Sequence, residues 1–159
     1  MPIITLPDGS KIMSLIDGSK KMSKSDPNEN SRINLLDPPE IITKKIKRAK
    51  SDSVIGIEFN NPERPESKNL LMIYSILSGK EISQCEKEFS ETGWGTFKKL
   101  ITEQLIDSLE PIQQKYKLLI NDPYQLNKIL NEGKAKAQDL ANQTLKRVKS
   151  KLGFFEMEK

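Results

Sequence analysis

Hydrophobic residues near the N-terminus fall into two short runs, at residues 3–6 and 12–16, with a Pro-Asp-Gly sequence at 7–9 between them. Short apolar runs separated by such a turn are typical of strand, turn and strand. Residues 18–34 have no hydrophobic period and are rich in Gly, Ser, Lys, Asn and Asp. They predict a mobile loop.

From residue 37 onward, most apolar positions recur at helical spacing. Residues 37–50 are predicted to form the first helix. They begin with Asp-Pro-Pro-Glu, which offers a capping side chain, a proline in the first turn and an acid three residues after the cap. A second helix is predicted to end at Gly79, and Ser83 with Glu86 forms the capping box of another. Residues 54–59 are predicted as a short strand.

Two longer stretches complete the pattern. A helix from Phe97 to Ile120 should kink or break at Pro111, because proline removes one backbone hydrogen bond and clashes with the preceding turn. Residues 122–130 predict a short helix and residues 134–152 the last one. The positions assigned to the inward face of that last helix are Ala137, Leu140, Ala141, Leu145, Val148 and Leu152. Antiparallel helices joined by short loops predict a bundle.

Composition narrows the possible chemistry. The 159 residues can form one main core, and no apolar run approaches the ~20 residues of a membrane span. The single cysteine, Cys85, excludes an internal disulfide framework and suggests a reducing compartment. The sequence has no histidine, which argues against Ser-His-Asp hydrolysis and zinc chemistry. Carboxylates, lysines, hydroxyls and backbone groups remain, and they favour electrostatic stabilisation of phosphates.

Charge is unevenly distributed. Lys and Arg outnumber Asp and Glu ten to six in residues 1–50 and eight to four in residues 128–159, whereas residues 51–127 carry eight against twelve. The last basic cluster consists of Lys146, Arg147, Lys149 and Lys151, with no acid among residues 140–155. It is interpreted either as a solvated helix surface or as a contact for the backbone of a nucleic acid.

The most informative segment lies in the polar loop. Lys21-Met22-Ser23-Lys24-Ser25 places two ammonium groups three residues apart among two hydroxyls. Such groups can bind neighbouring oxygens of one polyphosphate. For an arbitrary sequence a solvated linker would be the simpler interpretation, but the order of these residues matches the KMSKS signature of class I aminoacyl-tRNA synthetases letter for letter.

The surrounding sequence resembles tryptophan-tRNA synthetases of the bacterial or organellar type over nearly the whole chain. The segments that carry this resemblance are residues 25–28, 33–37, 44–49, 67–71, 93–98, 109–113 and 133–153. The implied fold class is mainly α, a helical bundle preceded by a short remnant of the α/β nucleotide-binding domain. Residues 1–34 would end that domain and carry the loop, and residues 35–159 would form the helical domain that meets the tRNA anticodon.

The resemblance also implies site residues and ligands. Lys21 and Lys24, with Ser23 and Ser25, would contact the phosphates of ATP, while Ile12 and Met22 would lie near the adenine. ATP with Mg²⁺ is the expected cofactor, no protein side chain is expected to hold a metal, and tRNA(Trp) is the expected partner. The family implies a homodimer, a cytoplasmic or alternatively organellar location, and no membrane association.

The chain departs from the family in one respect. Without histidine it cannot contain the HIGH signature, and the tryptophan pocket is expected to lie in a part of the enzyme that this sequence does not include. The expected function is a C-terminal portion of a tryptophan-tRNA ligase that is inactive alone. A stand-alone tRNA-binding module without catalysis and a tyrosine-specific relative remain the alternatives.

Overall fold

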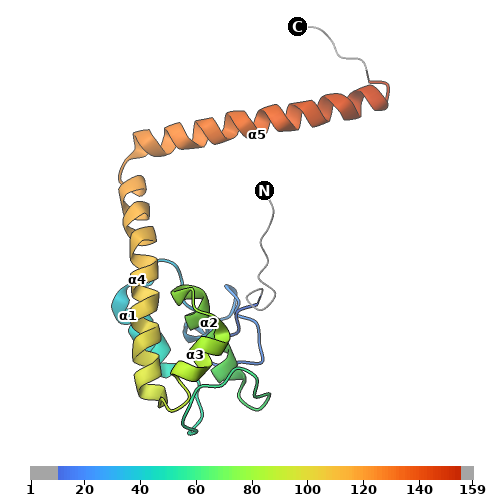
Figure 1. Ribbon diagram of the computed structural model, residues 1–159. Helices are drawn as coiled ribbons and strands as arrows, with labels where there is room; N and C mark the ends of the chain where they lie inside the picture. The colour runs from blue at the N-terminus through green and yellow to red at the C-terminus, as the bar shows by residue number, and fades with distance from the viewer. Residues whose placement is uncertain (1–10, 155–159) are drawn as a thin grey trace. The chain divides into compact units, whose positions relative to one another are not determined.

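A computed structural model describes residues 11–154, and these residues are mainly α-helical (Figure 1). The elements are η1 (Glu29–Ser31), α1 (Pro39–Arg48), α2 (Pro65–Ser78), α3 (Ile82–Glu88), α4 (Trp94–Ile120) and α5 (Pro123–Lys151). This confirms the predicted fold class. The chain divides into two compact units, one ending at Gln113 and the other beginning at Gln114. The domain boundary expected between residues 34 and 35 stays a prediction.

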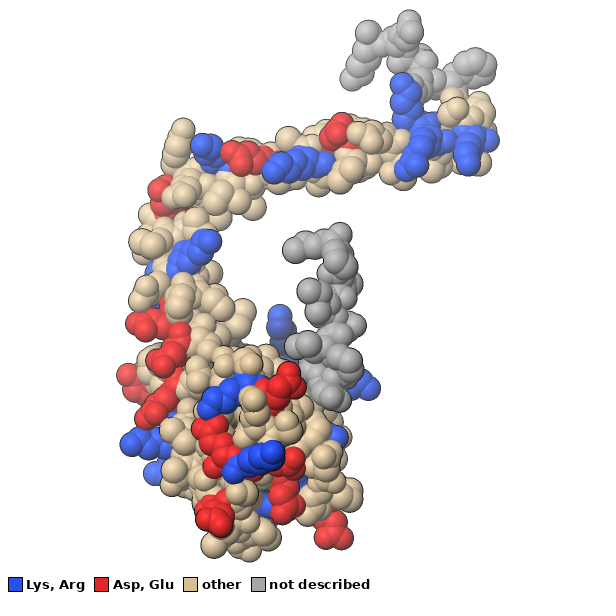
Figure 2. Space-filling view, viewed as in Figure 1, with Lys and Arg blue, Asp and Glu red and all other residues tan. Residues whose placement is uncertain are grey.

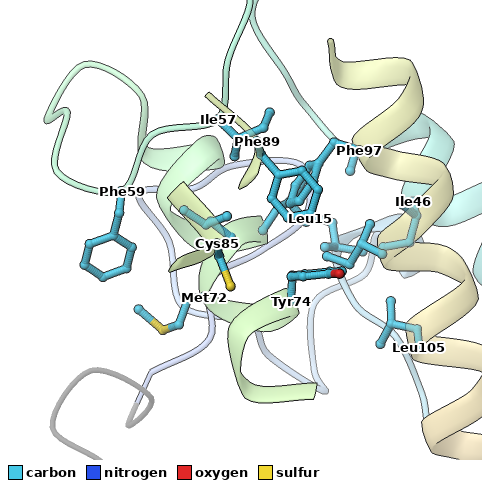
Figure 3. Close-up of a cluster of buried hydrophobic side chains, with 14 of the residues drawn as sticks. Leu15, Ile46, Ile57, Phe59, Met72, Tyr74, Cys85, Phe89, Phe97 and Leu105 are labelled. Carbon is cyan, nitrogen blue, oxygen red and sulfur yellow. The ribbon is translucent and has the colours of Figure 1, made fainter. Parts of the chain in front are cut away.

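The first unit has one apolar core, to which α1, α2, α3 and the first half of α4 contribute. Figure 3 shows Tyr74, Phe89 and Phe97 together in this core. The ring centroids of Tyr74 and Phe89 lie 4.9 Å apart and those of Phe89 and Phe97 4.8 Å apart, both edge to face. This is a favourable arrangement for aromatic pairs. Cys85 is fully buried in the same core, and burial raises the pKa of its thiol.

The predicted strand, turn and strand can be compared only in part, because residues 1–10 lie outside the described residues. Residues 12–16 do not form a regular strand. Instead Met13 and Lys21 form an isolated antiparallel bridge, so that the polar segment folds back on the apolar run. The prediction missed this pairing because the partner run around Lys21 has no apolar alternation.

Helix ends were predicted with mixed success. Gly79 does end α2 in a left-handed conformation, with φ of 69°. Asp37 does not cap α1, since the N-cap is Pro38 and the Asp37 carboxylate accepts hydrogen bonds from the Asn34 amide and the buried Lys45 ammonium. The capping box predicted from Ser83 and Glu86 does not form either. The N-cap is Glu81, and the Glu86 carboxylate accepts from the distant Phe59 amide at 2.7 Å.

The short strand predicted at residues 54–59 is absent from the described structure. Gly56 interrupts the extended run with φ of 88°, and the amides of Gly56 and Ile57 donate to the carbonyls of Thr92 and Phe89 at 3.1 and 3.0 Å. The segment therefore pairs with the connection between α3 and α4 and forms no sheet.

Neither of the two breaks predicted in the long helices occurs. α4 is not broken at Pro111, because the loss of one hydrogen bond is tolerated in a helix of 27 residues whose earlier turns are anchored by buried side chains. α5 continues through Gly133, which keeps its amide and costs only about 1 kcal/mol relative to alanine. The face of α5 predicted to point inward is exposed among the described residues, with Leu140 67% and Leu152 67% exposed. Among the described residues, no side chain of α5 is buried.

Candidate functional site

The lysine-serine segment begins on the second arm of a small hairpin. The Met22 amide donates to the Ile12 carbonyl at 2.9 Å, and the Ser14 amide donates to the Lys20 carbonyl at 2.8 Å. These bonds flank the bridge between Met13 and Lys21. The backbone of Lys21 is therefore held in the hairpin, and Lys24 lies in the turn that follows the hairpin.

Short-range hydrogen bonds shape the segment after the hairpin. The hydroxyl of Ser23 accepts from the Ser25 amide at 3.3 Å and lies 3.0 Å from the Ser25 hydroxyl. Asp26 accepts from the Asn28 amide at 2.8 Å, and Asn28 caps η1 through the Asn30 amide. Ser, Asn and Asp favour such local bonds to their own backbone. The loop is shaped by these polar contacts, while the side chains of Ser23, Lys24 and Ser25 remain exposed.

Lys21 and Lys24 are both exposed, and within residues 11–154 neither forms an ion pair. Lys20 differs, since its ammonium lies 3.2 Å from the Asp17 carboxylate. Hydrogen bonds from Ser19, and then from Lys20, lower the pKa of Asp17 to about 2. All three lysines are exposed, but among the described residues only the two in the signature have no ion-pair partner.

Ile12 and Met22, expected near the adenine, are brought together by the structure. Both line an apolar hollow of about 330 Å³ that lies against the core of the first unit. The other lining residues are Leu15, Ile33, Ile46, Ile73, Ile76, Leu77 and Leu105. Met22 belongs both to this hollow and to the segment that carries the exposed lysines.

The basic cluster expected to contact tRNA lies at the C-terminal end of α5, where Figure 2 shows Lys and Arg side chains gathered. Lys146, Arg147, Lys149 and Lys151 are all exposed. No described residue from 140 to 154 is acidic. This end of the helix therefore presents concentrated positive charge.

Trp94 lies between Gly93 and Gly95, and the sequence favours the anchor of a turn over a platform for stacking a base. The structure supports the anchor. The indole nitrogen donates to Asp52 at 3.1 Å, and the ring packs edge to face on Phe97 with centroids 6.2 Å apart. The guanidinium of Arg64 and the ammonium of Lys98 lie within 6 Å of the indole centroid, at 5.9 and 5.8 Å.

Asp52 gives the fold a pH dependence that can be measured. Partial burial alone would raise its pKa, but hydrogen bonds from Arg64, Trp94 and the Val54 amide outweigh this and lower the pKa from 3.8 to about 2. A lowered folded-state pKa adds stability above the unfolded pKa and loses it as pH falls through the folded one. Asp52→Asn should therefore destabilise the protein at pH 5, and its difference from wild type should shrink between pH 4 and 2. Urea unfolding across this range measures it, and a constant difference would contradict the assignment.

Among residues 11–154, no helix combines the length and the apolarity needed to cross a bilayer. The same residues contain no cluster of three or more His, Cys, Asp or Glu side chains that could hold a metal ion.

A helical unit that carries a Lys-Met-Ser-Lys-Ser hairpin loop defines part of a class I synthetase. The family model described as "tRNA synthetases class I (W and Y)" matches residues 2–110, and the chain belongs to this family.

Individual relatives narrow the similarity to the tryptophan branch. A tryptophan--tRNA ligase of Prochlorococcus marinus subsp. pastoris is 74% identical over 98% of this chain and 46% of its own length. A chloroplastic/mitochondrial tryptophan--tRNA ligase of Arabidopsis thaliana is 46% identical over 93% of this chain and 36% of its own length. The crystal structure of tryptophanyl-tRNA synthetase from Mycoplasma pneumoniae superposes with a TM-score of 0.83 at 33% identity, over 94% of this chain and 45% of that one. The chain spans less than half the length of these relatives.

Proposed function

We propose that this chain supplies the ATP-phosphate loop and the tRNA-binding helices of a tryptophan-tRNA ligase. The observation that carries the proposal is the pair of exposed ammonium groups, Lys21 and Lys24, on a hairpin-anchored loop without acidic partners among the described residues. The similarity to tryptophan--tRNA ligases over nearly the whole chain supports the choice of amino acid.

The two lysines fit the charge changes of adenylate formation. An oxygen of the tryptophan carboxylate attacks the α-phosphorus of ATP, the bond from that phosphorus to the bridging oxygen of the β-phosphate breaks, and pyrophosphate departs with the electron pair. Negative charge therefore grows on the β- and γ-phosphates, where Lys21 and Lys24 would donate hydrogen bonds. Cations that meet this charge best in the transition state lower the barrier more than they tighten ground-state binding. Mg²⁺ would accompany ATP as part of the substrate.

Neighbouring residues would complete the nucleotide contacts. Ser23 and Ser25 present hydroxyls on the same turn, and these can donate to phosphate oxygens. Ile12 and Met22 present an apolar surface of the kind on which a purine ring packs. The adenine and the triphosphate would then follow the direction of the second hairpin arm.

The remaining parts of the reaction site belong to the portion of the ligase that this chain does not span. The tryptophan pocket and the HIGH signature would come from there, so the chain alone is not expected to activate tryptophan. A fusion of the N-terminal part of the Prochlorococcus marinus ligase to this chain, here called the chimera, tests the proposal. Tryptophan-dependent exchange of pyrophosphate into ATP is expected from the chimera and not from the chain alone. Exchange by the chain alone, or none from a folded chimera that binds tryptophan, would refute it.

The basic end of α5 supports a contact with tRNA. Replacing Lys146, Arg147, Lys149 and Lys151 with Gln should weaken binding of tRNA(Trp) by the chain and flatten its dependence on salt, because each lost phosphate contact removes roughly 0.7 to 0.9 from the slope of log K against log salt. Gel-shift titrations at several salt concentrations measure this slope. Replacing Lys115, Lys117, Lys128 and Lys134 with Gln is a control with the same change in charge. An equal effect of both sets would show only a general charge contribution.

Two alternatives give different results in the same assays. A stand-alone tRNA-binding module would bind tRNA without giving an active chimera, and a tyrosine-specific relative would favour tRNA(Tyr) over tRNA(Trp). A cytoplasmic location is proposed from the bacterial relatives, with an organellar one as the alternative in view of the Arabidopsis protein.

A further inference from the structure

The side chain of Asn69 makes an unusual connection between α2 and the hairpin. Its Oδ1 accepts a hydrogen bond from the Met13 amide at 2.8 Å, and its Nδ2 donates to the Met13 carbonyl at 2.9 Å. Asn69 is only 2% exposed. The amide group thus satisfies both backbone groups of one residue, as a neighbouring strand would.

Met13 is also the residue bridged to Lys21 on the opposite arm. The contacts therefore run without interruption from α2 through Asn69 and Met13 to the first lysine of the signature. Loss of the Asn69 amide would leave the Met13 amide and carbonyl without these partners in a partly buried place, which is costly.

A second contact attaches the hairpin turn to the same helix. A Cβ placed on Gly18 would lie 2.8 Å from the backbone of Pro65 and of Glu66 at the start of α2, so only glycine allows this approach. The Glu66 carboxylate receives a hydrogen bond from the Gly18 amide at 3.4 Å and forms an ion pair with Lys50 at 2.8 Å. The hairpin is therefore held to α2 at its turn and at its root.

We propose that Asn69 is a positioning residue for the phosphate loop, which fixes the resting place of Lys21 and Lys24 relative to α2. The inference deepens the proposed function and rests on it for its catalytic consequence. Movement of α2 would be transmitted to the loop through Met13. Without Asn69 the hairpin would keep its turn contact and the backbone bonds of Leu15 to Ser31 and Lys50, but its first arm would lose the attachment to α2 at Met13. The loop would then reach the phosphates less often in a productive position.

The same helix provides a matched control. Ser67 is fully buried, and its hydroxyl accepts from the Glu58 amide and donates to the Glu58 carbonyl, both at 2.8 Å. Ser67→Ala therefore removes a comparable pair of hydrogen bonds to one backbone residue. It does so away from the hairpin, in the segment before α2.

Limited trypsin digestion of the full chain, followed by mass spectrometry, tests the positioning role. Cleavage after Lys20, Lys21 and Lys24 requires the loop to open locally, and Lys99 on α4 serves as an internal reference for wider unfolding. Asn69→Ala should speed cleavage at the three loop lysines about tenfold over the reference, since it removes two partly buried hydrogen bonds. Asn69→Leu, which keeps the side-chain volume, should do the same. Ser67→Ala should change the loop sites less than about threefold at a similar loss of thermal stability.

Equal acceleration by Asn69→Ala and Ser67→Ala, or none by either Asn69 variant, would overturn the inference. Pyrophosphate exchange by the chimera gives the catalytic readout. Asn69→Ala should lower kcat about tenfold with little change in the KM for ATP, whereas Ser67→Ala should leave both near the parent values. If the Asn69 variants open the loop but the wild-type chimera shows no exchange, the structural connection stands and the proposed function fails.

Discussion

Lys24→Ala in the chimera should lower kcat for tryptophan-dependent pyrophosphate exchange on the order of 10²-fold, with a much smaller rise in the KM for ATP. Lys24 is exposed on a turn that the hydrogen bonds between Ser23 and Ser25 hold in shape. Its ammonium is expected to bind the growing charge on the leaving pyrophosphate rather than to hold ATP in the ground state. Initial rates measured over a range of ATP concentrations separate the two effects.

Lys20→Ala is the matched control for this prediction. Lys20 is an exposed lysine in the same segment, but its ammonium pairs with Asp17 at 3.2 Å. Its replacement should change kcat less than about threefold, because an exposed ion pair contributes little. A rise in KM for Lys24→Ala at constant kcat would mean uniform binding and would contradict the transition-state role.

Gly56→Ala should lower the free energy of unfolding by roughly 3 kcal/mol, the largest loss of stability expected from adding one methyl group to this chain. Gly56 has φ of 88°, and a Cβ there would lie 2.3 Å from the Ser90 carbonyl oxygen. Both the backbone strain and the clash would have to be relieved. The displacement would disturb the loop that Arg64 holds through the Gly56 carbonyl at 2.8 Å. Urea unfolding measures the loss.

Gly79→Ala separates strain from clash. Gly79 also has a positive φ, of 69°, but a Cβ there would meet nothing within 4 Å. This change should cost only about 1 kcal/mol. If both variants lost the same stability, the close approach of Gly56 to Ser90 would not be a feature of the protein in solution.

The sequence predicted the features that depend on neighbouring residues. The helical content followed from apolar spacing, the left-handed end of α2 followed from Gly79, and the lysine-serine loop followed from the order of its residues. The pairing of Ile12 with Met22 followed only from the family resemblance, and the structure brings the two to one apolar hollow. Their contact with adenine and the roles of Lys21 and Lys24 stay predictions.

The missed features depend on partners far apart in the sequence. Nothing near Asn69 indicates that its amide pairs with Met13, which is 56 residues away, and Asp52 gives no sign of its bonds to Arg64 and Trp94. A glycine such as Gly18 is common in any polar loop, so the sequence did not indicate that this one lies close to the backbone of α2. These contacts arise when the helices pack, and periodicity and turn chemistry carry no information on them.

The predicted ends of the two long helices were wrong for a related reason. Proline costs about 3 kcal/mol and glycine about 1 kcal/mol inside a helix, but the hydrogen bonds and good helix formers around Pro111 and Gly133 offset these costs. Apolar spacing in α5 predicted a core face, but no residue of α5 is buried among the described residues, so the spacing alone did not indicate a packed face.

The central claim is that Lys21 and Lys24 bind the triphosphate of ATP, and lysine acetylation of the chimera, quantified residue by residue, tests it most directly. ATP with Mg²⁺ should protect Lys21 and Lys24 from the reagent, while AMP, which lacks the β- and γ-phosphates, should not. Lys20 and the exposed Lys44 should react equally in both cases. Equal labelling of Lys21 and Lys24 with ATP, with AMP and without nucleotide, in a chimera shown to bind ATP, would contradict the claim.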